Sequence, residues 1–435
     1  MLTAVLTLFA VLFGALSAGL WIGLTLALTG VVMLGLFKSV PLDKLLAQYT
    51  WNILTTQELL ALPLFIVMGE ILFRTRLSAS LFNGLAPWAG LLPGRLLHVN
   101  VVGCSIFAAM SGSSAATTLV VGRLSLAELL KRGYSRDIAI GSLAGAGTLG
   151  FLIPPSNILI IYGVLGEVSI LKLFTAGIIP GLLLALAFMA WIMIHTRLRP
   201  SLVPASEHAL GSIPWADRFR ALKDLAPAVF LIVCVLGSMY RGWATPSESA
   251  AVGVLGAVIV TAIQGTLTFE NAKSILMGAV TTCAMIALIV LGASILASSI
   301  AFLGIPKAIA DWVASLGLSP FMLIAALVAF YLILGCFLDG FSMIVMTLPI
   351  VLPIVKAAGF DPIWFGIFLV MVVEMAQITP PVGFNLFVIQ GLTEDSLGYI
   401  ARVTMPYLFI MVGFTLLLAI FPEIVMYLPN RVTKS

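Results

Sequence analysis

Long apolar stretches, separated by short polar turns, fill nearly the whole of this 435-residue chain and constrain its fold more than any other feature. Only 9% of the residues are charged, against about 25% in soluble domains. Within a bilayer only helices and closed barrels satisfy their own backbone hydrogen bonds, and the short alternating segments of a barrel do not occur here. The sequence therefore predicts an all-α polytopic membrane protein.

Few residues carry the chemistry of catalysis or of metal binding. The cysteines lie in apolar runs without C-x-x-C spacing and the histidines are scattered, so we expect buried hydrophobes and no metal cluster. No nucleotide-binding loop, metalloprotease motif or nucleophile elbow is present. No basic residue precedes Lys38, so the apolar N-terminus is expected to be a retained helix and not a secretory signal. We expect neither enzymatic activity nor a cofactor.

The two halves of the chain resemble each other on either side of a long polar interval, residues 197–224. A shift of 226 residues superposes the following without a gap: Gly133 on Gly359, Pro154-Pro155 on Pro380-Pro381, and Pro180 on Pro406. We interpret this as an internal duplication. It predicts a first repeat over residues 1–196, a cytoplasmic linker over 197–224 and a second repeat over 225–430.

The charges of two matching turns predict that the copies have opposite orientations. The turn "LLKRGYSRD" of the first copy carries three basic residues, whereas its mate "VKAAGFDP" carries only Lys356 and adds Asp361. Lys and Arg gather on the cytoplasmic side, so the two turns face opposite sides of the membrane. This is an inverted repeat, which is common among secondary transporters. It places the first turn inside and residues 166–169 outside.

Two pairs of apolar segments are too short to be complete spans. Residues 96–110 and 115–130 flank "SGSS", and at about 1.5 Å per residue each arm reaches only ~23 Å, short of a hydrocarbon core of roughly 30 Å. We therefore predict a re-entrant helical hairpin over residues 96–130 and its mate over 320–355, around "FLDGFS". Polar tips at this depth need protein or water around them, so we expect them to meet an internal cavity.

The two double prolines predict two discontinuous helices. Proline has no amide hydrogen, so Pro154-Pro155 releases the carbonyls of Gly150 and Phe151, and Pro380-Pro381 releases those of Ala376 and Gln377. In lipid each released carbonyl costs several kcal/mol unless it is satisfied, and a cation such as sodium can satisfy it. The alternative is a proline kink without function.

Polar side chains around the tips and breaks are candidates for binding an anion, which the positive ends of half-helices favour. The candidate substrate-binding residues are Ser114, Asn157, Asp339 and Asn385. The serines of "SGSSAATT" could instead serve helix packing, and Asp339 could instead form a structural hydrogen bond to neighbouring backbone. Glu70 and Glu374 also lie in apolar runs. Either could face solvent near a helix end, so neither is assigned a role.

Five ordered motifs resemble the large membrane subunit of the tripartite ATP-independent periplasmic (TRAP) transporters, and the resemblance covers essentially the whole chain. The motifs are "MSGSSAATT", "GFLIPPSNILIIYG", "LFTAGIIPGLL", "LGCFLDGFSMIVMTLPI" and "QITPPVGFNLFVIQG". The resemblance implies a sodium-driven importer of organic acid anions in the bacterial inner membrane. It also implies two partners, a periplasmic substrate-binding protein and a small four-helix membrane subunit, and an elevator-type movement of the hairpins against a scaffold.

The resemblance further implies two sodium sites and no cofactor besides these coupling ions. The first site would use oxygens of Ser111, Ser113, Gly150, Ile153 and Pro155, and the second those of Gly335, Ala376, Thr379 and Val382. Under the 226-residue shift Gly150 faces Ala376, a position where the family more often has glycine. One other class of function stays open at this point, a passive channel or non-catalytic scaffold subunit, whereas an intramembrane enzyme is disfavoured because the sequence has no paired carboxylates, histidine cluster or nucleophile with a base. The resemblance does not specify the organic acid.

Overall fold

The computed structural model describes residues 2–38, 41–75, 77–205, 207, 213–315, 319–381 and 383–432. Within these ranges the secondary structure consists of α-helices and two short 3-10 helices, with no strand. In the described part of the chain, seven helices are long and apolar enough to cross a membrane, among them the hairpin arm Gly340–Ala357, or eight if a pair bent by 52°, Leu42–Leu54 with Gln57–Phe73, is one span. The predicted all-α polytopic fold is confirmed.

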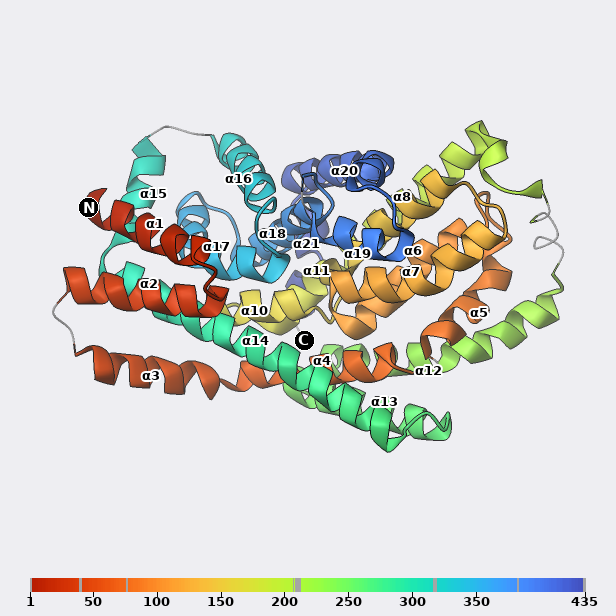
Figure 1. The fold of residues 1–435 in the computed structure, drawn as a ribbon, viewed down its shortest axis with the longest axis horizontal. Helices are drawn as coiled ribbons and strands as arrows, with labels where there is room; N and C mark the ends of the chain where they lie inside the picture. Colours follow the sequence, from red (N-terminus) through yellow and green to blue (C-terminus); the bar gives the residue numbers. More distant parts are fainter. Residues whose placement is uncertain are drawn as a thin grey trace.

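An outer set of helices lies along one side of the molecule (Figure 1). It consists of α1 (Leu2–Ser17), α2 (Ile22–Phe37), α3 (Leu42–Leu54), η1 (Gln57–Leu60), α4 (Ala61–Phe73), α12 (Trp215–Tyr240), α13 (Pro246–Ile263) and α14 (Phe269–Phe302). The longest contact joins α14 to α2, and α13 packs on both α4 and α12. Two glycines allow the first pair to approach closely, because a Cβ atom added to Gly292 would lie 2.1 Å from the carbonyl oxygen of Gly23.

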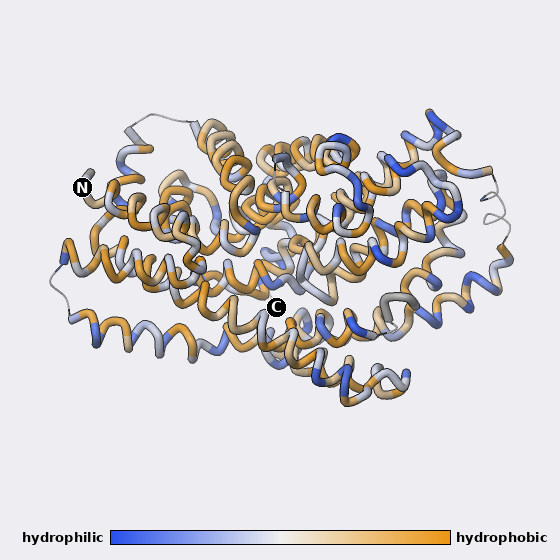
Figure 2. Tube along the Cα trace, viewed as in Figure 1, coloured by the Kyte–Doolittle hydropathy of each residue, from blue (hydrophilic) through white to orange (hydrophobic). Residues whose placement is uncertain are grey.

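The outer helices present apolar side chains outward. Leu28, Phe230 and Leu255 are 43%, 61% and 61% exposed, and Figure 2 shows hydrophobic residues along most of each helix, with hydrophilic residues mainly near helix ends and turns. A soluble monomer rarely exposes apolar surface on this scale. The surface is that of a protein whose solvent is lipid.

The inner set contains the two predicted hairpins. They are α6 (Leu97–Ser111) with α7 (Ser114–Lys131), and α16 (Pro320–Leu334) with α17 (Gly340–Ala357). These helices lie within a few residues of the predicted arms, and their re-entrant path through the membrane stays a prediction. We call residues 111–114 tip one and residues 335–342 tip two. Ser113 and Asp339 are the N-caps of α7 and α17, so each second arm begins with a side chain that accepts a backbone N–H.

Both double prolines interrupt helices, as predicted. The first broken helix is α8 (Arg136–Gly147), α9 (Leu149–Leu152) and α10 (Asn157–Gly166); the second is α18 (Pro362–Gln377) and α19 (Phe384–Thr393). We call residues 153–156 break one and residues 378–383 break two. The bonds Pro154-Pro155 and Pro380-Pro381 are both cis. The additional interruption at Thr148, between α8 and α9, was not predicted.

The two broken helices run in opposite directions. The Tyr162 hydroxyl, on α10, donates to the carbonyl oxygen of Pro362 at the start of α18, at 2.6 Å. At the other end, Arg136 at the start of α8 forms an ion pair of 2.9 Å with Asp395, just beyond α19. Each broken helix therefore begins where the other ends, and the inverted repeat predicted from the turn charges is confirmed.

A long helix follows each broken helix and packs on the opposite copy. These helices are α11 (Ile170–Leu198) and α20 (Leu397–Ile420); α11 packs on α18, and α20 on α8. The remaining helices are α5 (Leu77–Ala89), η2 (Pro200–Leu202), α15 (Ile305–Ser315), α21 (Glu423–Met426) and α22 (Pro429–Val432). Helix α11 extends to Leu198 and α12 begins at Trp215, so helices enter both ends of the predicted linker, 197–224. Its polar residues are compatible with an exposed helix, which composition alone did not reveal.

Candidate functional site at the tips and breaks

Tip one packs directly into the first broken helix. A Cβ atom on Gly150 would lie 2.4 Å from the Ser114 Cα, and one on Gly112 would lie 2.8 Å from the carbonyl oxygen of Pro155. The backbone N–H of Asn157 donates to the Gly112 carbonyl oxygen at 3.3 Å, and its side-chain Nδ2 donates to the Ser111 carbonyl oxygen at 3.2 Å. These contacts bring most residues of the first predicted sodium site together.

The hydroxyls of tip one are already partly engaged. The Ser111 hydroxyl is 3.1 Å from the Thr117 hydroxyl, and the Ser113 hydroxyl accepts the N–H of Ala116 at 3.4 Å. A hydroxyl oxygen has two lone pairs, so both can still offer an acceptor position. Ile153 differs from the others, because its side chain packs toward Gly181 of α11.

Tip two meets the second broken helix in the corresponding way. A Cβ atom on Gly335 would lie 2.2 Å from the Ala376 Cβ. The carbonyl oxygens of Gln377 and Thr379 converge on Gly383, which has a φ of +55°, since a Cβ there would be 3.0 Å from each of them. The Thr379 hydroxyl donates to the Met375 carbonyl oxygen at 2.6 Å. Oxygen atoms thus gather at break two; the predicted ligand Val382 lies outside the described residues.

The four candidate substrate residues fall into two groups. Asn385 Nδ2 donates to the Ser114 hydroxyl at 2.7 Å, and Asn157 is bonded to the same tip. Both asparagines are buried, and their Oδ1 atoms have no hydrogen-bond partner among the described residues, nor has Gln377 Nε2. Buried polar atoms without partners are rare and indicate a place for water, an ion or a ligand.

Asp339 behaves differently from the other three. Its carboxylate accepts the N–H of Phe341 at 3.1 Å and the hydroxyl of Ser342, both on its own helix. These are the contacts of the structural alternative raised for this residue. Tip two nevertheless reaches the first repeat, because the rings of Phe341 and Phe151 meet edge to face at 5.3 Å. The two half-sites therefore adjoin.

Glu374, to which the sequence assigns no role, does not face solvent, so that expectation is wrong. Its side chain is fully buried and bridges to the first repeat: Oε2 accepts the Ser114 hydroxyl at 2.8 Å and Oε1 accepts the Phe151 N–H at 3.0 Å. The signal was its position as a lone carboxylate in an apolar run. Glu70 is partly exposed and forms an ion pair of 3.0 Å with Arg74, one helical turn away. Ion pairs of this kind at a surface contribute little to stability.

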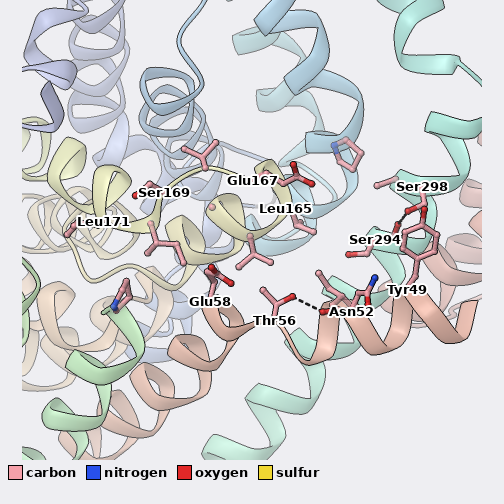
Figure 3. Close-up of a pocket in the computed structure, with 18 residues that line it drawn as sticks. Tyr49, Asn52, Thr56, Glu58, Leu165, Glu167, Ser169, Leu171, Ser294 and Ser298 are labelled. Carbon is pink, nitrogen blue, oxygen red and sulfur yellow. Dashed lines mark hydrogen bonds between the residues drawn. The ribbon is translucent and has the colours of Figure 1, made fainter. Parts of the chain in front are cut away.

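A cavity of about 800 Å³ opens to one side of the site (Figure 3). It lies between the end of α3, η1, the turn from α10 to α11, α14 and α17, and Glu58, Glu167, Ser294 and Ser298 are around it. None of the predicted site residues lines it. The polar tips do not border this cavity but pack against the breaks, and the expectation that they meet an internal cavity stays a prediction. Helix α10 connects the two places, since Gly163 at the cavity is six residues, about 9 Å, from Asn157.

Comparison with known proteins decides the family. Residues 9–424 match the family described as "Tripartite ATP-independent periplasmic transporter, DctM component". The chain belongs to this DctM family. The chain is 35% identical over 378 residues to the C4-dicarboxylate TRAP transporter large permease protein of Pseudomonas aeruginosa, covering 87% of each. It is also 30% identical over 420 residues to the sialic acid TRAP transporter large permease protein of Vibrio cholerae, covering 96% of each. The resemblance drawn from the five motifs is confirmed.

The DctM-family chain also shares its fold with a solved transporter. The YdaH transporter of Alcanivorax borkumensis superposes with a TM-score of 0.57 at 15% sequence identity, over 82% of this chain and 84% of that one. At this identity the likeness concerns the fold alone. The relatives are transporter permeases, which favours a transport role for this DctM-family chain over an enzymatic one.

Proposed function

We propose that this chain is the large permease subunit of a secondary transporter that couples the uptake of an organic acid anion to sodium across the bacterial inner membrane. The observation that carries the proposal is the pair of oppositely oriented broken helices, each met at its double proline by a hairpin tip. Discontinuous helices in inverted repeats are the usual way in which transporters form ion and substrate sites at mid-membrane. Both relatives compared above are named for organic acids.

Two sodium ions would bind at the places where tip and break meet. Site one would use Ser111, Ser113, Gly150, Ile153 and Pro155, and site two Gly335, Ala376, Thr379 and Val382. The close approach of Ser114 to Gly150 and of Gly335 to Ala376 supports this assignment. The prolines deprive nearby carbonyls of their helical donors, so a cation that accepts neutral oxygen ligands would stabilise them.

The anion would bind between the two half-sites. Ser114, Asn157 and Asn385 are the polar groups available there, and the N-termini of α7 and α17 supply positive dipole ends. Asp339 is the N-cap of α17 and fixes the shape of tip two. We propose that it is required for transport. Two sodium ions with a monoanion would gain from the membrane potential, at about 2.3 kcal/mol per charge per 100 mV, whereas two with a dianion would rely on the sodium gradient alone.

Transport would follow an elevator movement with two partners. The hairpins and broken helices pack on one another and would move as a block against the outer helices. The name of the family describes a tripartite system, and we assign the other two parts to a periplasmic binding protein and a small four-helix membrane subunit. The 800 Å³ cavity borders residues 167–169, on the predicted outer side, and would be a vestibule for the anion that the binding protein releases.

Uptake into proteoliposomes tests the proposal. The chain, reconstituted with its small subunit and supplied with loaded binding protein, is expected to accumulate the anion only under an inward sodium gradient. For serine variants at tip one, Ser125→Ala is a suitable control, because the buried Ser125 hydroxyl bonds within α7, to the Val121 carbonyl oxygen. Flux that follows the anion gradient alone, without sodium and without the binding protein, would assign the chain to the passive channels instead.

A further inference from the structure

One carboxylate links the two repeats at the heart of the candidate site. Glu374 lies on α18 of the second repeat, and both of its described hydrogen bonds go to the first repeat: Oε2 to the Ser114 hydroxyl at 2.8 Å and Oε1 to the Phe151 N–H at 3.0 Å. We call this set of contacts the inter-repeat bridge. All of it is buried, since the side chains of Glu374 and Ser114 are 0% and 1% exposed.

The Ser114 hydroxyl collects contacts from three other helices. Besides Glu374 of α18, it accepts from Asn385 Nδ2 of α19 at 2.7 Å and lies 3.1 Å from the Gly147 carbonyl oxygen of α8. The Glu374 carboxylate and the Gly147 carbonyl oxygen both accept and therefore share the one hydroxyl proton, while Asn385 uses one of the two lone pairs. The position of tip one therefore depends on where α18 holds the carboxylate.

The bridge joins residues that neighbour ligands of both proposed sodium sites. Phe151 follows Gly150, and Ser114 follows Ser113, so the carboxylate holds two segments of site one. Glu374 itself is two residues before Ala376 on the helix whose end forms site two. A sodium ion that orders the end of α18 would thereby fix the groups that must ligate the other ion.

The inter-repeat bridge has no equivalent in the first repeat, although the rest of the fold is duplicated. The 226-residue shift places Glu374 opposite Thr148, whose hydroxyl donates to the Gly145 carbonyl oxygen of its own helix at 2.6 Å. A carboxylate needed only to stabilise the packing of a hairpin on a broken helix would be needed equally in both copies. Its presence in one copy suggests a task that the pair of sites performs once.

We propose that Glu374 is a positioning residue that couples sodium binding at one half-site to sodium binding at the other. The inference rests on the proposed function and adds to it a residue for which the sodium sites themselves do not account. Sodium at site two orders the end of α18 and thereby fixes the position of Glu374. The inter-repeat bridge then holds tip one and the Phe151 N–H in place, so site one binds its ion more tightly. By linkage the same coupling acts in the reverse direction.

Three substitutions separate positioning from charge. Glu374→Met keeps the length of the side chain but removes both acceptors. Glu374→Asp keeps the carboxyl group but is one methylene too short to reach both donors. Glu374→Gln can keep the geometry, because Oε1 accepts the Phe151 N–H while Nε2 donates to the Ser114 hydroxyl, which then donates to the Gly147 carbonyl oxygen. Thr148→Val, at the equivalent position of the other repeat, is the matched control.

The experiment is a sodium titration of anion uptake by the complete reconstituted transporter, with thermal unfolding of each variant measured in sodium-free buffer. The wild type and Thr148→Val are expected to show a Hill coefficient close to the number of coupled sites, about 2. Glu374→Met and Glu374→Asp should lower it toward about 1 and raise the half-saturating sodium concentration about 10-fold, within the usual range of coupling. Glu374→Gln should retain the wild-type coefficient.

Several results would overturn the inference. They are a Hill coefficient near 1 in the wild type, an unchanged coefficient in the Met variant, and a Gln variant that behaves like Met, which would make charge the requirement. A Met variant with lower thermal stability and slower uptake but an unchanged coefficient would give Glu374 a purely structural role. If the Met variant does not fold, the Hill coefficients of the Asp and Gln variants test the inference: a lower coefficient for Asp than for Gln supports it, and equal coefficients contradict it. Sodium-independent uptake by the wild type would instead refute the proposed function itself.

Discussion

The side chain of Asn385, at the start of α19 in the second repeat, donates a 2.7 Å hydrogen bond to the hydroxyl of Ser114 at tip one in the first repeat. The two residues are 271 positions apart in the sequence, and both are buried. The two half-sites of the candidate site therefore share one buried polar cluster between the repeats. Its unpartnered atoms include the Oδ1 of Asn385 itself, which leaves an acceptor available for a donor from a ligand or a water.

Replacing Asn385 by alanine is expected to weaken anion uptake. The change removes the amide that orients Ser114 together with a candidate substrate contact, and hydrogen bonds to charged groups are worth about 1.5–3 kcal/mol, so KM should rise about 10-fold or more at saturating sodium. The measurement is uptake against anion concentration in proteoliposomes. Asn271→Ala is the control, because that amide bonds to the Thr266 carbonyl oxygen at the start of α14. An unchanged KM would remove Asn385 from the site.

Replacing Thr379 by alanine is expected to impair sodium dependence and not folding. The Thr379 hydroxyl is near the oxygen cluster of break two and bonds to the carbonyl four residues earlier, at 2.6 Å. Thr404 of α20 makes the same type of bond, to the Ile400 carbonyl oxygen at 2.8 Å, but lies outside the site. Thr379→Ala should raise the half-saturating sodium concentration about 10-fold, whereas Thr404→Ala should not. Equal behaviour of the two variants would contradict the second sodium site.

Asp339 can be tested as a cap and as a transport residue separately. Serine also caps helices well, whereas alanine at an N-cap costs about 1 kcal/mol of stability. Asp339→Ala should lower the unfolding temperature and abolish sodium-dependent uptake, and Asp339→Ser should restore the stability but not the uptake. Thermal unfolding in detergent and vesicle uptake give the two readouts. Full uptake by the serine variant would reduce Asp339 to a helix cap.

A pair of substitutions exchanges a methyl group between tip two and break two. Gly335→Ala alone would place a Cβ 2.2 Å from that of Ala376, and such overpacking typically costs about 1–3 kcal/mol. Adding Ala376→Gly removes the clash and leaves both backbone carbonyls in place. We expect low stability and low uptake for the single variant and substantial recovery of both for the double variant. Failure of the double variant to recover stability would mean that these two residues are not in contact.

Omission of the partners is expected to abolish most uptake. The chain reconstituted alone should transport little, and activity should return only when both the small subunit and the loaded binding protein are present. The readout is uptake of labelled anion under a fixed sodium gradient, with each component left out in turn. Robust transport by the chain alone would exclude the tripartite mechanism for this protein.

Local chemistry explains which parts of the fold were predictable. Proline interrupts a helix wherever it occurs in the interior, so the two breaks followed from Pro154-Pro155 and Pro380-Pro381 directly. The hairpins were predicted from short arms on either side of a polar tip; of the first pair, α6 with 15 residues is below the length of a span and α7 with 18 residues is at its lower limit. The turn charges predicted the inverted arrangement, which the Tyr162–Pro362 and Arg136–Asp395 contacts then confirmed.

Long-range pairing explains what could not be predicted. Glu374 gains its partners, Ser114 and Phe151, only because the inverted repeats bring α18 beside tip one, and no local pattern encodes a contact across more than 220 residues. The same holds for the packing of the tips. Their polarity was visible in the sequence, but whether they would meet water or the broken helix of their own repeat depends on Gly150 and Gly335, whose missing side chains allow direct contact.

The close approach of Gly23 and Gly292 has a practical consequence for measuring motion. Because backbone lies against backbone at these two residues, there is no room for one helix to shift against the other, and we expect α2 and α14 to be displaced together as one rigid body. Spectroscopic labels attached to the lipid-facing side of this pair would serve as a fixed origin. Distances from that origin to labels on the hairpins would then report the travel of the inner helices alone.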